Sequence, residues 1–297
     1  MATTIRTASQ PFAWILVTLL NAGCPVSGKP AALSGSDRRR PSPQWVEGLQ
    51  GRLRVDDGGS GDPPVVFVHG NGANRTQWAA QLTHLRARRR AVAFDLRGMG
   101  ESALPASGDY SVEGFAQDVA AVVDALEIQR FVLVGHSYGG AVICAYAGKH
   151  PERLAGLLFA DSAGDLSRTP PGDIEALRRG LEAGSYEQFT RKWFEGILVN
   201  ATEETRAAVM RSLRSTPREA FVGATMGLYD FRPGQAFERF RGPRLSIASY
   251  LADSPLAIHR CFPGTPVRVM KGVSHWLMMD HPEEFNRLLD EFLATIS

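Results

Sequence analysis

The stretch Phe131-Val132-Leu133-Val134-Gly135-His136-Ser137-Tyr138-Gly139-Gly140 decides the fold. Its first four residues are apolar and rich in valine, which predicts a buried β-strand. The pattern G-x-S-x-G follows, and residues 141–147 can continue as a helix. In a strand–turn–helix context, such a turn strains the serine backbone and exposes its hydroxyl at the end of a sheet. We therefore predict Ser137 as a nucleophile; the alternative is a glycine-rich turn that only joins a strand to a helix.

Two further motifs lie upstream, each directly after a short apolar run. His69-Gly70 follows the run at residues 65–68, and Asp95-Leu96-Arg97-Gly98-Met99-Gly100-Glu101-Ser102 follows the run at residues 91–94. Together with the serine motif they resemble the α/β-hydrolase family in its single-domain, lid-bearing form, from about residue 51 to the C-terminus. We interpret Asp95 and Arg97 as charged residues that tie loops together and take no part in chemistry.

The resemblance implies an oxyanion hole made of two backbone N–H groups. In the family these belong to the residue after His-Gly and to the residue after the nucleophile, which are Asn71 and Tyr138 in this sequence. Many relatives carry an apolar residue and then proline after His-Gly, so Asn71 is a departure, and its side chain is a further candidate to point into the pocket. We expect His69, Tyr138 and Trp276 to border the substrate pocket.

The order of predicted elements favours an α/β fold. Strands and helices alternate between residues 50 and 163, which predicts a mostly parallel central sheet with helices on both faces. Residues 164–241 show helical patterns without a strand pattern, and this resembles the all-helical lid of the family. Strand patterns resume after that segment. We therefore expect a hydrolase core at residues 50–163 and 242–297, with a helical cap at residues 164–241 inserted between two strands.

A serine hydroxyl is a weak nucleophile at neutral pH and needs a base, which in turn needs an orienting carboxylate. The chain has seven histidines. His275 follows the last predicted strand, and this placement matches the base of the family. We interpret His69 and His136 as residues that shape their loops, and His281, next to a proline, as a surface position.

Two aspartates are candidates for the orienting acid. Asp253 lies in the loop after the strand at residues 244–249, where most relatives carry the acid, although it comes about one position late. Asp161 follows the strand before the helical segment, where some relatives, certain haloalkane dehalogenases among them, place theirs. We take Asp253 as the first choice and Asp161 as the alternative acid.

The N-terminal segment differs from the rest of the chain. A basic residue precedes an apolar run at residues 12–20, which is too short to span a bilayer but fits a secretory signal peptide. We expect a signal peptide at residues 1–28 and a linker at residues 29–49. The protein is then secreted or periplasmic; the alternative is a disordered extension on a cytoplasmic protein.

Composition narrows the class of protein further. With 44% hydrophobic and 22% charged residues the chain is of globular type, and a net charge of +2 gives no reason to expect a nucleic-acid partner. The three cysteines have no metal-ligand spacing, so we expect no metal, no cofactor and no disulfide framework. The expected partner is a small-molecule ester, and a homo-oligomer is compatible with the sequence.

A serine nucleophile argues against the dehalogenases and epoxide hydrolases of the family, which need a carboxylate nucleophile. The resemblance thus implies a serine esterase of carboxylesterase or lactonase type that acts through an acyl-enzyme. Carbon–carbon bond hydrolysis, amide hydrolysis, acyl transfer and perhydrolysis share the same triad and stay open. A small-ligand binding protein on a hydrolase scaffold is the alternative outside the enzymes, because fold does not fix function.

Overall fold

The computed structural model describes residues 42–249 and 251–296. Its centre is an eight-stranded sheet with the strand order β1-β2-β4-β3-β5-β6-β7-β8. The pairs β1–β2 and β2–β4 are antiparallel, and all other neighbours are parallel. The strands are β1 (Ser42–Gly48), β2 (Gly51–Gly58), β3 (Val65–Val68), β4 (Ala91–Phe94), β5 (Phe131–His136), β6 (Leu154–Ala160), β7 (Arg244–Ala248) and β8 (Val267–Val269).

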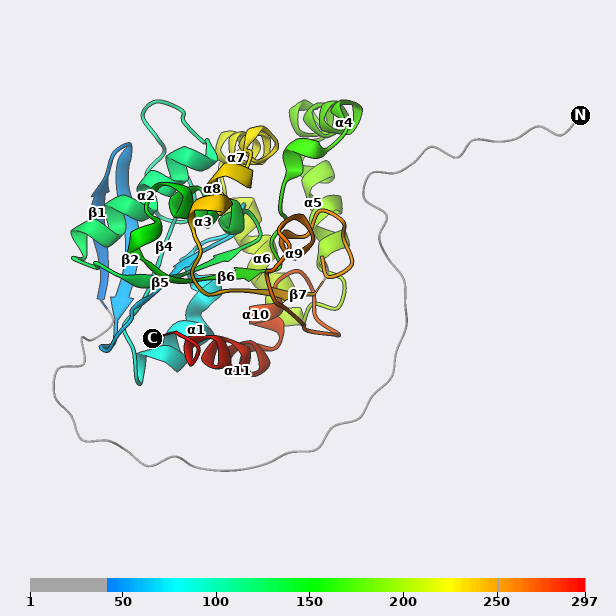
Figure 1. Cartoon of the computed structure of the whole chain (residues 1–297). Helices are drawn as coiled ribbons and strands as arrows, with labels where there is room; N and C mark the ends of the chain where they lie inside the picture. Colours follow the sequence, from blue (N-terminus) through cyan, green and yellow to red (C-terminus); the bar gives the residue numbers. More distant parts are fainter. Residues whose placement is uncertain (1–41, 250, 297) are drawn as a thin grey trace, which may run out of the picture. The chain divides into compact units, whose positions relative to one another are not determined.

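Helices cover both faces of this sheet (Figure 1). Strands β3 to β6 are buried at every residue, because a parallel sheet with helices on both faces has no solvated side. One face is covered by α2 (Val112–Ala125) and α3 (Tyr138–Lys149), and the other by α1 (Ala79–Arg86), α10 (Leu277–Asp280) and α11 (Pro282–Leu293). In β5, Phe131 and Leu133 pack with α2 and α3, whereas Val132 and Val134 pack with α1 and α11. Short helices lie at η1 (Arg75–Trp78), η2 (Pro151–Arg153) and α9 (Ile258–Cys261).

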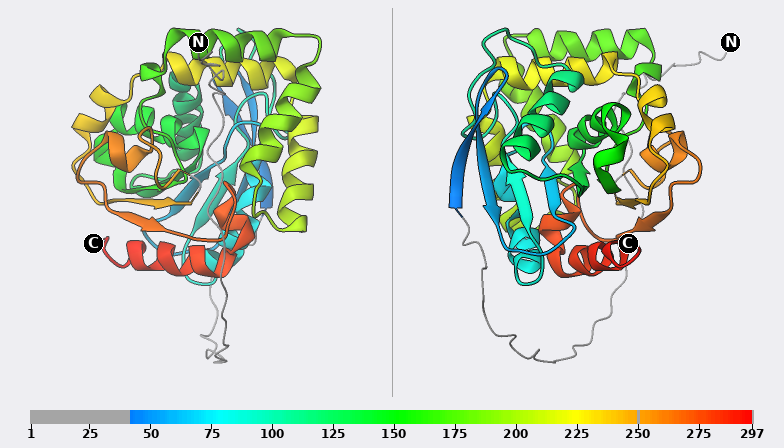
Figure 2. Two further views of the ribbon diagram at one scale, coloured as in Figure 1. Left: turned by 90° about the vertical axis from the view of Figure 1, so that its right-hand side faces the viewer. Right: turned by 60° about the vertical axis from the view of Figure 1, so that its left-hand side comes forward.

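Between β6 and β7 the chain is helical, and we call residues 164–241 the helical insertion. Its elements are η3 (Leu166–Arg168), α4 (Pro171–Glu182), α5 (Tyr186–Ile197), α6 (Glu203–Ser215), α7 (Arg218–Asp230) and α8 (Gly234–Arg239). The ring of Phe194 lies 5.8 Å from that of Phe221 within the insertion and 5.6 Å from that of Trp276 in the core. Figure 2 shows α4 (green) and α7 (yellow) on the opposite side of the domain from α11 (red).

The structure corrects the predicted linker at residues 29–49. Residues 42–48 form β1, an edge strand that pairs with β2 through a hairpin in which Gly48 faces Gly51. The prolines and polar residues around position 42 favoured a linker, but an edge strand tolerates proline because one side of it needs no hydrogen-bond donor. The rest of the predicted linker and the predicted signal peptide lie outside the described residues.

In residues 42–249 and 251–296, every helix is too short or too polar to span a bilayer.

Candidate active site

Ser137 forms a sharp turn between β5 and α3. Its φ of 52° and ψ of −116° lie outside the regions that L-residues favour. Glycines make this turn possible: a Cβ on Gly135 would lie 2.4 Å from the carbonyl oxygen of Gly139, and a Cβ on Gly139 would lie 2.5 Å from that of Val68. Ser137 stays half-buried while the residues around it in the sequence are buried. The turn therefore presents the predicted nucleophile at the carboxyl end of β5.

The His69-Gly70 loop lies directly against this turn. The Nε2 atom of His69 accepts a hydrogen bond of 2.9 Å from the N–H of Leu96, so the ring proton is on Nδ1 and is donated to the Gly70 carbonyl over 2.8 Å. Burial lowers the pKa of His69, which keeps the ring neutral. A Cβ on Gly70 would lie 2.9 Å from the Nδ1 atom of His136 and 3.2 Å from the Cβ of Ser137. Only glycine allows the loop to come this close to the serine.

The side chain of Asn71 turns to the helical insertion. Its Nδ2 donates to the carbonyl of Phe221 (3.0 Å) and to the Oγ1 of Thr225 (2.8 Å). The hydroxyl of Thr225 donates its own proton to Phe221 over 2.7 Å, so it must accept from Asn71, and this fixes the orientation of the amide. The side chain thus ties the loop to α7, and the predicted oxyanion donor is the backbone N–H of the same residue.

His275 follows β8 and is held by contacts from several elements. Its Nδ1 atom lies 2.8 Å from Oδ2 of Asp161. Its backbone N–H donates to the carbonyl of Ile197 at the end of α5 over 3.1 Å. Its carbonyl accepts a 2.9 Å bond from Nε2 of His136, whose pKa is lowered well below 6.5 chiefly by burial and also by the neighbouring His275. The ring of His275 is therefore oriented by a carboxylate, and its backbone is fixed to the insertion and to the serine loop.

Asp161 lies beside the serine turn because β5 and β6 are neighbours. The N–H of Ser137 donates to the carbonyl of Ala160 over 3.0 Å, and Asp161 is the next residue, with a positive φ of 44°. The carboxylate is fully buried and accepts hydrogen bonds from the N–H groups of Ser249 and Leu251. Ser137, Asp161 and His275 thus follow the carboxyl ends of β5, β6 and β8 at one edge of the sheet, with Asp161 next to the serine turn and in contact with His275.

This geometry corrects the choice of Asp253 as the partner of His275. Asp253 is exposed on the loop after β7, and the carboxylate at Nδ1 of His275 belongs to Asp161. The reason lies at the end of β7, where backbone N–H groups of the loop bind the carboxylate of Asp161. Two features of the sequence favoured Asp161 as the acid: Asp253 comes about one position late, and Asp161 directly follows the preceding sheet strand.

Two of the predicted pocket residues are also corrected. His69 and Tyr138 are 0% and 1% exposed, and both ring nitrogens of His69 are bonded to backbone groups of the core, those of Gly70 and Leu96. The ring of Tyr138 packs edge-on against Phe115, and its hydroxyl lies 3.5 Å from the carbonyl of Tyr110, inside the core. Burial raises the pKa of Tyr138 well above its usual range. Trp276 contacts the rings of His275 and Phe194, and its place at the pocket stays a prediction.

Asp95 and Arg97 make the loop contacts expected of them. The carboxylate of Asp95 accepts 2.6 Å hydrogen bonds from the N–H and the guanidinium of Arg75. Arg97 forms a buried pair with Asp118 at 2.6 Å. The sequence pattern gave no sign of Asp118, which lies in the middle of α2, because its partner comes from a loop outside that helix.

Within residues 42–249 and 251–296, no cluster of three or more His, Cys, Asp or Glu side chains is placed to hold a metal ion. Cys144 and Cys261 are free thiols, and burial raises the pKa of Cys144.

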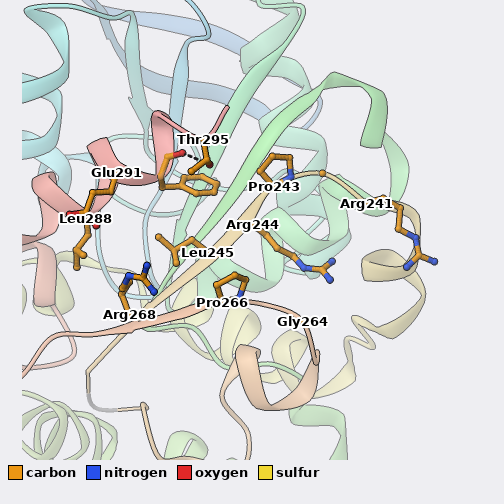
Figure 3. A pocket seen from close by; sticks show the side chains of 12 residues that line it. Arg241, Pro243, Arg244, Leu245, Gly264, Pro266, Arg268, Leu288, Glu291 and Thr295 are labelled. Atoms are coloured by element: carbon orange, nitrogen blue, oxygen red, sulfur yellow. Dashed lines mark hydrogen bonds between the residues drawn. The ribbon is translucent and has the colours of Figure 1, made fainter. Parts of the chain in front are cut away.

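A surface pocket of about 440 Å³ lies at the other end of the sheet (Figure 3). It is bordered by Arg244 and Leu245 at the start of β7, by Pro266 before β8, and by Leu288 of α11. Because the predicted site residues follow the carboxyl ends of the strands, this pocket is separate from them. Another pocket, of about 910 Å³, lies in the helical insertion and is bordered by Tyr186 and Leu213.

Comparison with known proteins identifies the family. The family model for the alpha/beta hydrolase fold matches residues 63–221, and the chain belongs to this family. The predicted mostly parallel sheet with helices on both faces is confirmed, and the structure adds that it has eight strands.

Relatives in this family include two different kinds of hydrolase. The chain is 38% identical over 286 residues to a 2-hydroxymuconate semialdehyde hydrolase of Pseudomonas sp. strain CF600, covering 82% of this chain and 90% of that protein. It is 25% identical over 258 residues to a 2-hydroxy-6-oxo-2,4-heptadienoate hydrolase of Pseudomonas putida strain F1, covering 81% and 92%. The solved structure of a thermophilic esterase from Thermogutta terrifontis matches with a TM-score of 0.72 and 25% identity, covering 86% of this chain and 98% of that one. Membership of the family and these relatives support a hydrolase activity.

Proposed function

We propose that the protein is a serine hydrolase that cleaves small to medium carboxylic esters or lactones through an acyl-enzyme. Ser137 is the nucleophile, His275 the base and Asp161 the orienting acid. The observation that carries this proposal is the 2.8 Å contact between His275 and Asp161 at the strand end next to the strained serine turn.

The Asp161 contact sets the tautomer of His275. A carboxylate accepts hydrogen bonds, so Nδ1 of His275 carries the ring proton and Nε2 keeps its lone pair. Nε2 can then take the proton of the Ser137 hydroxyl as its oxygen attacks the carbonyl carbon of the ester. The resulting imidazolium is stabilised by the buried carboxylate of Asp161.

The backbone N–H groups of Asn71 and Tyr138 bind the oxygen that becomes negative in the tetrahedral intermediate. Tyr138 is the first residue of α3, where an N–H has no acceptor within the helix, and the helix dipole favours negative charge at that end. Collapse of the intermediate releases the alcohol, which takes its proton from Nε2 of His275. Water then attacks the acyl-Ser137 ester with His275 again as base, and this step releases the acid and restores the serine.

We further propose that the helical insertion is the lid of this site. It contacts the loops of two of the proposed reacting groups: Asn71 is bound to α7, and the N–H of His275 is bound to the end of α5. Between the helices, rings of Trp193, Phe194 and Phe221 pack within about 6 Å of one another. A lid of this kind excludes water and offers an apolar wall to the acyl part of a substrate.

Hydrolysis of a carbon–carbon bond is the second candidate. It is favoured by the 38% identity to a 2-hydroxymuconate semialdehyde hydrolase over most of both chains. Both reactions use an activated serine, so the site geometry supports either.

The test is a substrate panel with purified wild type and Ser137→Ala. We expect hydrolysis of p-nitrophenyl acetate and butyrate and of short lactones by the wild type, lost in the variant. Turnover of 2-hydroxymuconate semialdehyde without any turnover of esters or lactones would replace the ester proposal by carbon–carbon hydrolysis.

A further inference from the structure

Ser249 is the first residue after β7, and the sheet brings it to Asp161. Ile247 of β7 pairs with Ala160 of β6, and the N–H of Asp161 donates to the carbonyl of Ile247 over 2.7 Å. Two adjacent parallel strands end here at the same level. Ser249 therefore stands at the end of the strand after which Asp253 was expected to supply the acid.

Ser249 contacts both oxygens of the Asp161 carboxylate. Its N–H donates to Oδ1 over 2.7 Å, and its hydroxyl lies 3.1 Å from Oδ2. Oδ1 also accepts from the N–H of Leu251 over 3.2 Å, and Oδ2 also contacts Nδ1 of His275. Backbone donors thus hold one oxygen, whereas the oxygen that faces His275 is held by a side chain. Substitution at position 249 removes the hydroxyl and leaves the backbone contacts.

The same hydroxyl reaches the loop that carries His275. It lies 2.8 Å from the carbonyl oxygen of Ser274, the residue before His275. A hydroxyl has one proton, so it is shared between this carbonyl and Oδ2 of Asp161. Ser274 is itself held by Asp280, which accepts from its N–H (2.8 Å) and its hydroxyl (2.6 Å). One oxygen atom therefore joins the acid to a fixed part of the histidine loop.

We propose that Ser249 is a positioning residue that sets the orientation of the Asp161 carboxylate relative to His275. Its hydroxyl prevents the carboxylate from rotating about its last bond and fixes the distance between the end of β6 and the histidine loop. Ser249 acts through Asp161 and does not touch the substrate. This inference rests on the proposed function, because it assigns Asp161 as the acid.

The first experiment measures kcat and KM of Ser249→Ala for p-nitrophenyl butyrate. Loss of one hydrogen bond to a charged group predicts a fall in kcat of about tenfold with KM unchanged. Thr83→Ala is the control, because the exposed Thr83 hydroxyl also donates one hydrogen bond, to the carbonyl of Ala79 over 2.9 Å, and lies outside both the site and the helical insertion. We expect the control to keep wild-type kcat. A Ser249→Ala variant with wild-type kcat would overturn the inference.

A double-mutant cycle separates positioning from a general effect on structure. If Ser249 acts through the carboxylate, Ser249→Ala in an Asp161→Asn background lowers the residual kcat by less than about twofold. If Ser249→Ala lowered kcat by the same factor in the Asp161→Asn variant as in the wild type, the hydroxyl would act independently of Asp161, and this would overturn the inference. Failure of the proposed function is distinguishable, because the wild type itself would then not hydrolyse the ester.

Discussion

The Nδ1 atom of His275 lies 2.8 Å from the Oδ2 atom of Asp161, so the imidazole after β8 is oriented by the carboxylate that follows β6. The two residues are 114 positions apart in the chain, and the strands that precede them, β6 and β8, lie on either side of β7 in the sheet.

The strained backbone of Ser137 predicts that a glycine variant at this position is more stable than an alanine variant. Glycine adopts a φ of 52° and ψ of −116° more readily than a residue with a Cβ. We expect Ser137→Gly to be more stable than Ser137→Ala by about 1 kcal/mol, the reverse of the order seen in regular helices and strands. Urea unfolding of the two inactive variants measures the difference, and a more stable alanine variant would contradict the strain.

The close approach of Gly70 predicts a large effect of one methyl group. The added Cβ in Gly70→Ala would meet Nδ1 of His136 and Cβ of Ser137, so the loop that carries the Asn71 N–H must move. We expect kcat to fall by roughly 10²-fold or more, the effect of losing one oxyanion donor. Gly172→Ala is the control, since a Cβ there has no neighbour within 4 Å. An active Gly70→Ala enzyme would mean that Asn71 does not bind the oxyanion.

The contact between Asn71 and Thr225 predicts coupling between the insertion and the core. Thr225→Val keeps the shape of the side chain but removes the hydroxyl that accepts from Asn71 and donates to Phe221. We expect a loss of about 1 to 2 kcal/mol in the free energy of unfolding. Thr83→Val is the matched control, because the exposed Thr83 hydroxyl donates only to the carbonyl of Ala79 within the same helix.

Kinetics of the same variant test the lid. If the insertion positions the Asn71 loop, kcat of Thr225→Val falls while Thr83→Val keeps wild-type values. Loss of stability with unchanged kcat would limit the contact to a structural role.

The buried histidines predict a loss of stability in acid. The pKa of His136 in the folded state is well below 6.5, so the unfolded chain binds a proton first as the pH falls. The stabilisation is complete above pH 6.5 and is lost below it, by about 1.4 kcal/mol per pH unit for one such histidine. We expect the free energy of unfolding of His136→Gln to depend less on pH between 6.5 and 5 than that of the wild type. Equal slopes would contradict a neutral, buried His136.

The sequence predicts those parts of the site that short segments determine. The buried run, the glycines and the serine of residues 131–140 specify a strand, a turn and a helix within ten residues, and the structure has each of them. The role of His275 could be predicted because it lies in the loop between the last strand and the closing helix. The predictions of the serine turn and of His275 thus depend on local pattern and on chain order.

The errors arise where distant segments meet. Asp161 and Asp253 both follow sheet strands, and β6 and β7 are neighbours, so spacing along the chain does not distinguish them. The choice depends on which side chain reaches His275, and this is decided by the N–H groups of Ser249 and Leu251. The orientation of Asn71 likewise depends on Phe221, 150 residues away.

The most direct test is the rate of labelling by a fluorophosphonate in four proteins: wild type, Ser137→Ala, Asp161→Asn and Asp253→Asn, with the modified peptide identified by mass spectrometry. We expect wild type and Asp253→Asn to react at Ser137 at the same rate, Ser137→Ala to be unlabelled, and Asp161→Asn to react roughly 10³- to 10⁴-fold more slowly because its His275 is left in the wrong tautomer. Fast labelling of Asp161→Asn with slow labelling of Asp253→Asn would contradict the assignment of the acid, and an unlabelled wild type would contradict the serine hydrolase itself.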